Sequence, residues 1–133
     1  MDLFEKESFP EIVRDGKIYA QVCLADEVYE GKGKQIRFPE DLDMQIALFR
    51  MQGNLYALEN ICPHRHADKI FDGVIRDMTV MCPLHGWTYE IDTGENIIKQ
   101  QGVKSLRKYD VYEEDGKVWV EKPKTDVIPK WRK

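Results

Sequence analysis

The chain has 133 residues, of which 42% are hydrophobic and 33% are charged. This composition is typical of a folded globular domain, and a chain of this length can bury a core without disulfide bonds. The net charge of -4 excludes the basic excess that phosphate binding normally needs, so we expect no nucleic-acid partner.

The sequence predicts neither a signal peptide nor a membrane span. The first 16 residues are too charged for a signal peptide, and no segment approaches the roughly 20 apolar residues of a membrane-spanning helix. Three cysteines, an odd number, do not form the disulfide framework of a small secreted protein. We therefore expect a cytoplasmic protein without a membrane partner.

Short runs rich in Ile, Val, Tyr and Phe follow one another along the chain, as is typical of β-strands. They predict eight strands, at residues 17–24, 34–38, 44–51, 54–61, 77–82, 88–91, 109–114 and 117–121. Gln52-Gly53 and Asp115-Gly116 separate neighbouring runs and can supply the positive φ angles of tight hairpins. Further turns are predicted at residues 30–34 and 92–96. The pattern predicts an all-β barrel or sandwich.

Two terminal segments fall outside this pattern. Residues 1–16 are predicted to be an N-terminal extension that could hold a short helix before Pro10. Residues 123–133 are predicted to be an extended tail that could pack through Trp131. We assign neither segment a function.

Two short arms carry the residues best suited to metal chemistry. The first arm is Cys62-Pro63-His64 and the second is Cys82-Pro83-Leu84-His85-Gly86, with 17 residues between His64 and Cys82. Thiolate and imidazole ligands suit zinc, copper and iron. A structural zinc site typically pairs like ligands on each arm, whereas here each arm is mixed. A two-iron cluster with two cysteines on one iron and two histidines on the other fits this mixing.

With these residues, the chain resembles the Rieske [2Fe-2S] family, most closely its soluble Rieske-type ferredoxins. The resemblance rests on "CPH", "CPLHGW" and "YEIDTG", and it extends weakly from Tyr19 to Val120. It implies a β-barrel or sandwich base over residues 17–122 that carries an inserted cluster-binding subdomain at about residues 60–100. It also implies a Rieske-type [2Fe-2S] cluster as the cofactor.

Carried over to this chain, the resemblance assigns four ligands. It implies that Cys62 and Cys82 bind the inner iron and that His64 and His85 bind the outer, more exposed iron. Gly86 would let the backbone turn close to the cluster, where its amide could donate to a sulfur atom.

Several residues near the arms are expected to play other parts. We predict that Cys23 is a buried core residue, and that His66 lies at the surface or beside the site rather than on a metal. Respiratory Rieske proteins have a disulfide where this chain has Ala67 and Leu84, and a serine where it has Trp87. These absences predict a potential in the lower half of the roughly -150 to +300 mV range of Rieske centres, raised somewhat by Tyr89.

The resemblance implies a one-electron carrier that takes electrons from a reductase and passes them to a terminal oxygenase or a related enzyme. We expect no catalytic residues, because no histidine remains outside the stretch of residues 62–87 for the second iron site of a complete oxygenase. Partner proteins should dock at the tip that bears His64 and His85. Two alternatives stay open: a small Rieske-like subunit of an assembled reductase such as nitrite reductase, and a non-redox zinc-binding interaction domain.

Overall fold

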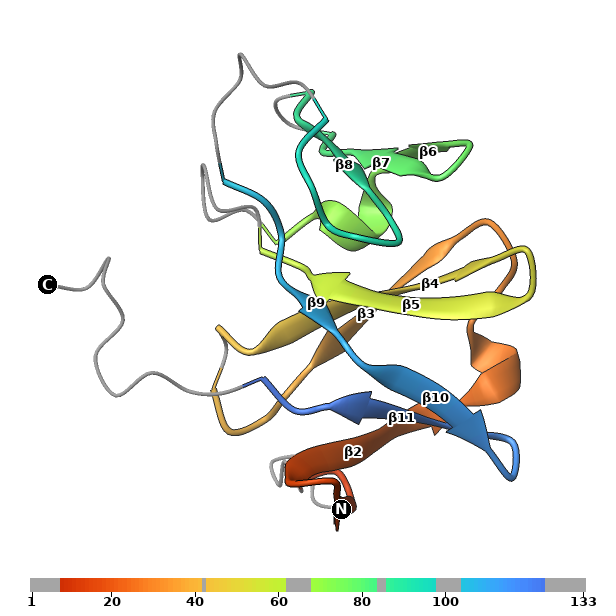
Figure 1. Cartoon of the computed structure of the whole chain (residues 1–133), viewed down its shortest axis with the longest axis vertical. Helices are drawn as coiled ribbons and strands as arrows, with labels where there is room; N and C mark the ends of the chain where they lie inside the picture. Colours follow the sequence, from red (N-terminus) through yellow and green to blue (C-terminus); the bar gives the residue numbers. More distant parts are fainter. Residues whose placement is uncertain (1–7, 42, 62–67, 84–85, 98–103, 124–133) are drawn as a thin grey trace, which may run out of the picture.

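The structure, a computed structural model, describes residues 8–41, 43–61, 68–83, 86–97 and 104–123. Within these ranges the chain forms three antiparallel sheets that lie in layers (Figure 1). Sheet A has the order β1 (Glu11–Arg14), β2 (Lys17–Leu24), β11 (Lys117–Glu121) and β10 (Val111–Glu114). Sheet B has the order β3 (Gly33–Arg37), β4 (Gln45–Met51), β5 (Asn54–Glu59) and β9 (Lys108–Tyr109). Sheet C consists of β6 (Val74–Arg76), β7 (Thr79–Met81) and β8 (Thr88–Glu90).

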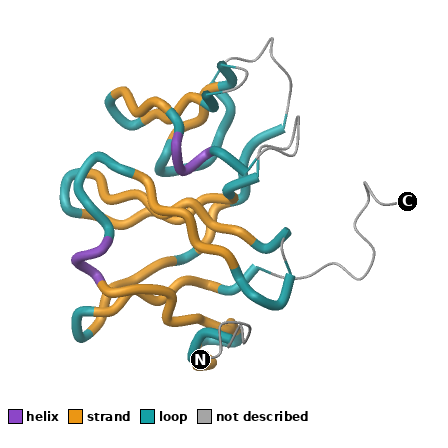
Figure 2. Tube along the Cα trace, turned by 180° about the vertical axis from the view of Figure 1, so that it is seen from behind, coloured by secondary structure: helices purple, strands orange, loops and turns teal. Residues whose placement is uncertain are grey.

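Little helix accompanies these strands. The described residues include the 3-10 helices η1 (Ala25–Glu27) and η2 (Ile70–Asp72), which Figure 2 shows between strands. None of the described helical segments has the length and apolar composition that a bilayer-spanning helix needs. The all-β fold class predicted from the sequence is therefore confirmed.

All eight predicted strands are present, with ends that differ by a few residues. The predicted hairpin turns are present too: Gln52 and Gly53 have φ angles of 55° and 82°, and Asp115 and Gly116 have φ angles of 55° and 75°. Two consecutive residues with positive φ suit the right-handed twist of the flanking strands.

Two strands were not predicted. β1 lies within the segment expected to be an N-terminal extension, yet it pairs along its length with β2. β6 lies between the two predicted metal-binding arms in the sequence and pairs with β7. The helix predicted before Pro10 falls mainly on residues 1–7, and Trp131 falls in the tail; both lie outside the described residues, and the domain boundaries remain a prediction.

Strand β4 is buried on both faces and separates two hydrophobic cores. Ile46 and Leu48 face a barrel core, which also contains Ala20, Val22, Ile36, Ala57, Val118 and Val120 from sheets A and B. Ala47 and Phe49 face a second core, which also contains Leu58, Ile70, Val80, Cys82, Tyr89, Ile91 and Leu106. Successive side chains of a strand point to opposite faces, so one apolar run serves both cores. Sheet B thus supports sheet C from below in the view of Figure 1.

The predicted strand at residues 109–114 is divided between two sheets. Its first part, β9, pairs with β5 in sheet B, whereas β10 pairs with β11 in sheet A. Asp110 lies at the crossing point, where its backbone amide donates to Glu121 Oε1 at 3.1 Å. Its carboxylate accepts hydrogen bonds from Lys17 Nζ at 2.7 Å and Tyr19 Oη at 3.3 Å. The crossing links the two sheets that enclose the barrel core.

Candidate metal centre

The second arm starts at the end of β7 and is closed by a hairpin. The Cys82 amide donates to the Trp87 carbonyl at 2.7 Å, which extends the β7–β8 pairing beyond Met81 and Thr88. The Gly86 amide donates to the Cys82 carbonyl at 3.0 Å. The described ends of the second arm, Cys82 on one side and Gly86 and Trp87 on the other, are therefore held together by hydrogen bonds.

Gly86 has the positive φ angle, 76°, that this tight loop requires. Its amide, however, donates to the Cys82 carbonyl within the loop. Donation from this amide to a cluster sulfur, which is expected from the sequence, stays a prediction, and the acceptor that the structure gives is the Cys82 carbonyl. Hairpin closure competes for this donor, which the sequence alone did not indicate.

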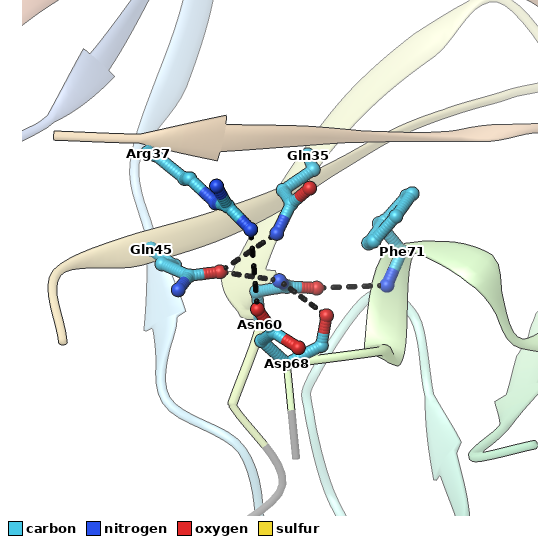
Figure 3. Close-up of polar contacts among 6 residues, drawn as sticks. All are labelled: Gln35, Arg37, Gln45, Asn60, Asp68 and Phe71. Carbon is cyan, nitrogen blue, oxygen red and sulfur yellow. Dashed lines mark hydrogen bonds and ion pairs between the residues drawn. The ribbon is translucent and has the colours of Figure 1, made fainter. Parts of the chain in front are cut away.

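The first arm follows β5 in the sequence, and the described residues on either side of it are joined by hydrogen bonds. Asn60 is fully buried, and its side chain accepts a hydrogen bond from the Phe71 amide at 2.8 Å. It also donates to Gln45 Oε1 at 2.9 Å and to the Asp68 carbonyl at 3.2 Å (Figure 3). Residues on both sides of the arm therefore meet at one amide side chain.

A third stretch returns beside the second arm. The Ile97 amide donates to the Thr88 carbonyl at 3.0 Å, which aligns this stretch with β8. The Leu106 amide donates to the Gly94 carbonyl at 2.8 Å, and the Asn96 amide donates to Ser105 Oγ at 3.1 Å. The two ends of the segment around residues 98–103 are thus joined.

Of the four predicted ligands, Cys82 is the one that the described residues include. It is fully buried and belongs to the same apolar cluster as Tyr89, Val80 and Ile70. Tyr89 is also fully buried, and Trp87 packs against this cluster while remaining partly exposed. A thiol in an apolar, water-excluding setting at the start of a tight loop suits the ligand position predicted for the inner iron. The described part of the site therefore fits the cofactor that the arms imply.

The remaining predicted ligands, Cys62, His64 and His85, lie outside the described residues. The same holds for His66 and for Ala67 and Leu84, so the predictions on these positions stay predictions. Among the described residues that follow the first arm, Asp68 forms an ion pair with Arg37 Nη2 at 3.5 Å. Lys69 is exposed.

Cys23, which was predicted to be a buried core residue, contacts the core but is only partly buried. It lies on β2 in sheet A and packs against the barrel core, although it is half-buried rather than fully enclosed. Burial raises the pKa of its thiol to about 11, so the thiol stays protonated near neutral pH. It has the surroundings of a packing residue rather than of a ligand.

Sequence reasoning missed the role of Asn60 and Gln45. Asn60 falls inside the run predicted as a strand over residues 54–61, but β5 ends at Glu59. The available signal was the pair Glu59-Asn60, two polar residues at the end of an apolar run and directly before the first arm. Gln45 gave no such signal, because its partners lie in other parts of the chain.

Comparisons with known proteins agree on one family. The family model of the Rieske [2Fe-2S] domain matches residues 18–110. A 3-phenylpropionate/cinnamic acid dioxygenase ferredoxin subunit from Escherichia coli K12 is 32% identical over 107 residues, which cover 80% of this chain and 94% of that protein. A corresponding subunit from Photorhabdus laumondii is 30% identical over 100 residues, which cover 74% of this chain and 90% of that protein.

Solved structures support the fold. The ferredoxin of Sphingomonas yanoikuyae B1 matches with a TM-score of 0.68 and 24% identity, covering 77% of this chain and 97% of that chain. A protein described as an NADH-dependent nitrite reductase small subunit from Mycobacterium tuberculosis matches with a TM-score of 0.70 and 21% identity, covering 82% of this chain and 98% of that chain. At these identities the likeness concerns the fold alone.

Proposed function

Because the chain belongs to the Rieske [2Fe-2S] domain family, we propose that it is a ferredoxin that carries single electrons from a reductase to a terminal oxygenase or a related enzyme. The observation that carries this proposal is the match, at 32% identity and along 94% of its length, to a ferredoxin subunit of a dioxygenase. The chain acts as a component of an oxidoreductase system and has no catalytic residues of its own. Its location is proposed to be the cytoplasm.

The four ligands of the proposal are Cys62 and Cys82 on the buried iron and His64 and His85 on the exposed iron. The [2Fe-2S] cluster, when bound, supplies reversible one-electron chemistry. The described residues surround Cys82 with buried apolar side chains, and hydrogen bonds join the described residues that flank each arm. Such surroundings tune a cluster through burial and hydrogen bonding. The cluster-binding subdomain is proposed to span about residues 60–100, within a domain of residues 17–122.

The partners of the proposal are redox proteins that reach the tip bearing His64 and His85. One matching structure is a complex of reduced oxygenase and oxidised ferredoxin in carbazole 1,9a-dioxygenase. The alternative of a small subunit in an assembled reductase is supported by fold likeness alone. The alternative of a zinc-binding interaction domain has no support among these relatives.

The proposal is tested by electron paramagnetic resonance of the anaerobically purified protein after dithionite reduction, with iron and zinc measured on the same sample. We expect about two irons per chain and a rhombic signal whose average g value lies below that of all-cysteine clusters. The reduced protein should then be reoxidised by a Rieske oxygenase without forming a permanent complex with it. A colourless protein with zinc and no iron would refute the proposal, and stable co-purification with a large reductase subunit would favour the subunit alternative.

A further inference from the structure

We propose that Asn60 is a positioning residue that fixes the geometry of the first arm. The inference rests on the proposed function, because it assumes that the first arm supplies Cys62 and His64 to the cluster. It goes beyond the ligand assignment by naming a residue that does not bind iron and yet controls how firmly iron is held.

The side chain of Asn60 uses its hydrogen-bonding groups on three different parts of the chain. Its Nδ2 donates to Gln45 Oε1 at 2.9 Å and to the Asp68 carbonyl at 3.2 Å, so both of its N–H groups have acceptors. Its Oδ1 accepts from the Phe71 amide at 2.8 Å. Gln45 lies on β4, whereas Asp68 and Phe71 belong to the segment that follows the first arm.

The backbone of Asn60 repeats the same connections. Its amide donates to the Gln45 carbonyl at 3.2 Å, and its carbonyl accepts from the Ile70 amide at 3.3 Å. The residue therefore holds the returning segment with both its side chain and its main chain. It is fully buried, so water does not compete for these bonds.

This arrangement closes a loop at its base. The chain leaves Asn60, passes through the first arm and returns to Asn60 at residues 68–71. Joining the ends of a chain segment reduces the number of conformations open to it, and here the buried, hydrogen-bonded side chain of Asn60 joins them. We infer that Asn60 thereby fixes the positions from which Cys62 and His64 are presented. Outer residues that orient metal ligands typically change metal affinity about 10- to 100-fold when they are removed.

Gln35 provides a matched control. Its Nε2 donates to the same Gln45 Oε1 at 2.9 Å, but it lies on β3, and its side-chain bond given by the structure reaches Gln45 rather than the returning segment (Figure 3). Gln35→Ala therefore removes a donor from the shared acceptor and leaves the loop base intact. Val118→Ala is a second control. Val118 is fully buried in the barrel core, so this substitution weakens the core without removing a contact of Asn60.

The test uses the full chain with its cluster loaded and compares the rate of iron release to a chelator and the electron paramagnetic resonance signal of the reduced protein. Asn60→Ala should release iron about 10- to 100-fold faster than the wild type and should broaden or shift the rhombic signal. Gln35→Ala and Val118→Ala should keep the wild-type signal and release iron at a rate near that of the wild type. Asn60→Ala that is folded and loaded, with wild-type release and a wild-type signal, would overturn the proposal.

A conservative variant covers the case in which Asn60→Ala does not fold. Asn60→Asp keeps an oxygen acceptor for the Phe71 amide and removes the amide donor to the Asp68 carbonyl. Iron release from Asn60→Asp that is faster than from Gln35→Ala supports the proposal. Iron release at the same rate from the two variants overturns it. A wild type that binds no iron would instead refute the proposed function, so the two failures are distinguishable.

Discussion

Replacing Gly94 by alanine should weaken the protein much more than the same change at Gly116. Both glycines have positive φ angles, 83° and 75°, which cost an L-residue about 1–2 kcal/mol relative to glycine. They differ in the space around them. A Cβ atom at Gly94 would lie 2.3 Å from the Leu106 carbonyl oxygen, whereas a Cβ atom at Gly116 would meet nothing within 4 Å.

The extra cost at Gly94 follows from this contact. A backbone oxygen cannot rotate away as a side chain can, so the turn at Gly94 and the segment that contains Leu106 must separate. Overpacking of this kind costs about 1–3 kcal/mol. The Leu106 amide also donates to the Gly94 carbonyl at 2.8 Å, so separation weakens a hydrogen bond as well. For a chain of this length, the difference between the two variants should be about 3–15 °C in unfolding temperature.

The assay is thermal unfolding of the cluster-loaded variants, followed by circular dichroism at one scan rate because unfolding of such a protein need not be reversible. Gly116→Ala serves as the control for the backbone effect alone. Equal unfolding temperatures for the two variants would refute the reasoning, because they would show that the close approach of Gly94 to Leu106 does not constrain the fold.

Further predictions concern the cofactor and pH. Tyr89→Phe should lower the midpoint potential, because it removes a buried hydroxyl beside the cysteine arm; an unchanged potential in voltammetry would exclude that role. Cys82→Ser should abolish iron binding, whereas Cys23→Ser should leave the iron content unchanged, and iron loss from the second variant would contradict its assignment to the barrel core. The midpoint potential should fall as pH rises through the pKa of a metal-bound imidazole, and a pH-independent potential would count against histidine ligation. The hydrogen bond from Lys17 lowers the pKa of Asp110 below 3.8, so the ionised carboxylate stabilises the fold above that pH and this contribution is lost as pH falls through the lowered pKa. Asp110→Asn should therefore reduce the loss of unfolding temperature as pH is lowered from about neutral. An equal loss in the variant and the wild type would contradict this.

The sequence predicted the fold class because strand periodicity and turn chemistry are local. Gln52-Gly53 and Asp115-Gly116 formed the expected hairpins, since the pairing that they connect involves adjacent runs. The split at Asp110 was not predictable in this way. The run at residues 109–114 has one continuous strand-like pattern, and its division depends on which of two sheets offers the next free edge.

The sequence predicts the ligand types and spacing of the candidate site, which stay a prediction, but it did not indicate the contacts that support the described part of the site. Cys82 appeared in a buried position after a strand, as the arm pattern implied. The hydrogen bonds of the Asn60 side chain join Gln45 on β4 to Asp68 and Phe71, which lie more than twenty residues later in the chain. Such a network depends on the tertiary approach of distant segments, and an isolated asparagine at the end of a strand does not reveal it. β6 was missed for a related reason, because three residues are too few to establish a period.

The double burial of β4 limits how freely this protein could be recombined with others. Leu48 and Phe49 are neighbours in sequence, and they fill different cores on opposite sides of one strand. If only the predicted metal-binding loops were grafted onto a different barrel, they would lie against side chains of that barrel that do not complement them in shape. Ala47 and Phe49 of β4, which fill the second core here, would be missing. A working chimera would need to carry the alternate residues of β4 along with the loops. Substitutions in the barrel core and substitutions in the core beneath sheet C are therefore coupled, because β4 contributes side chains to both.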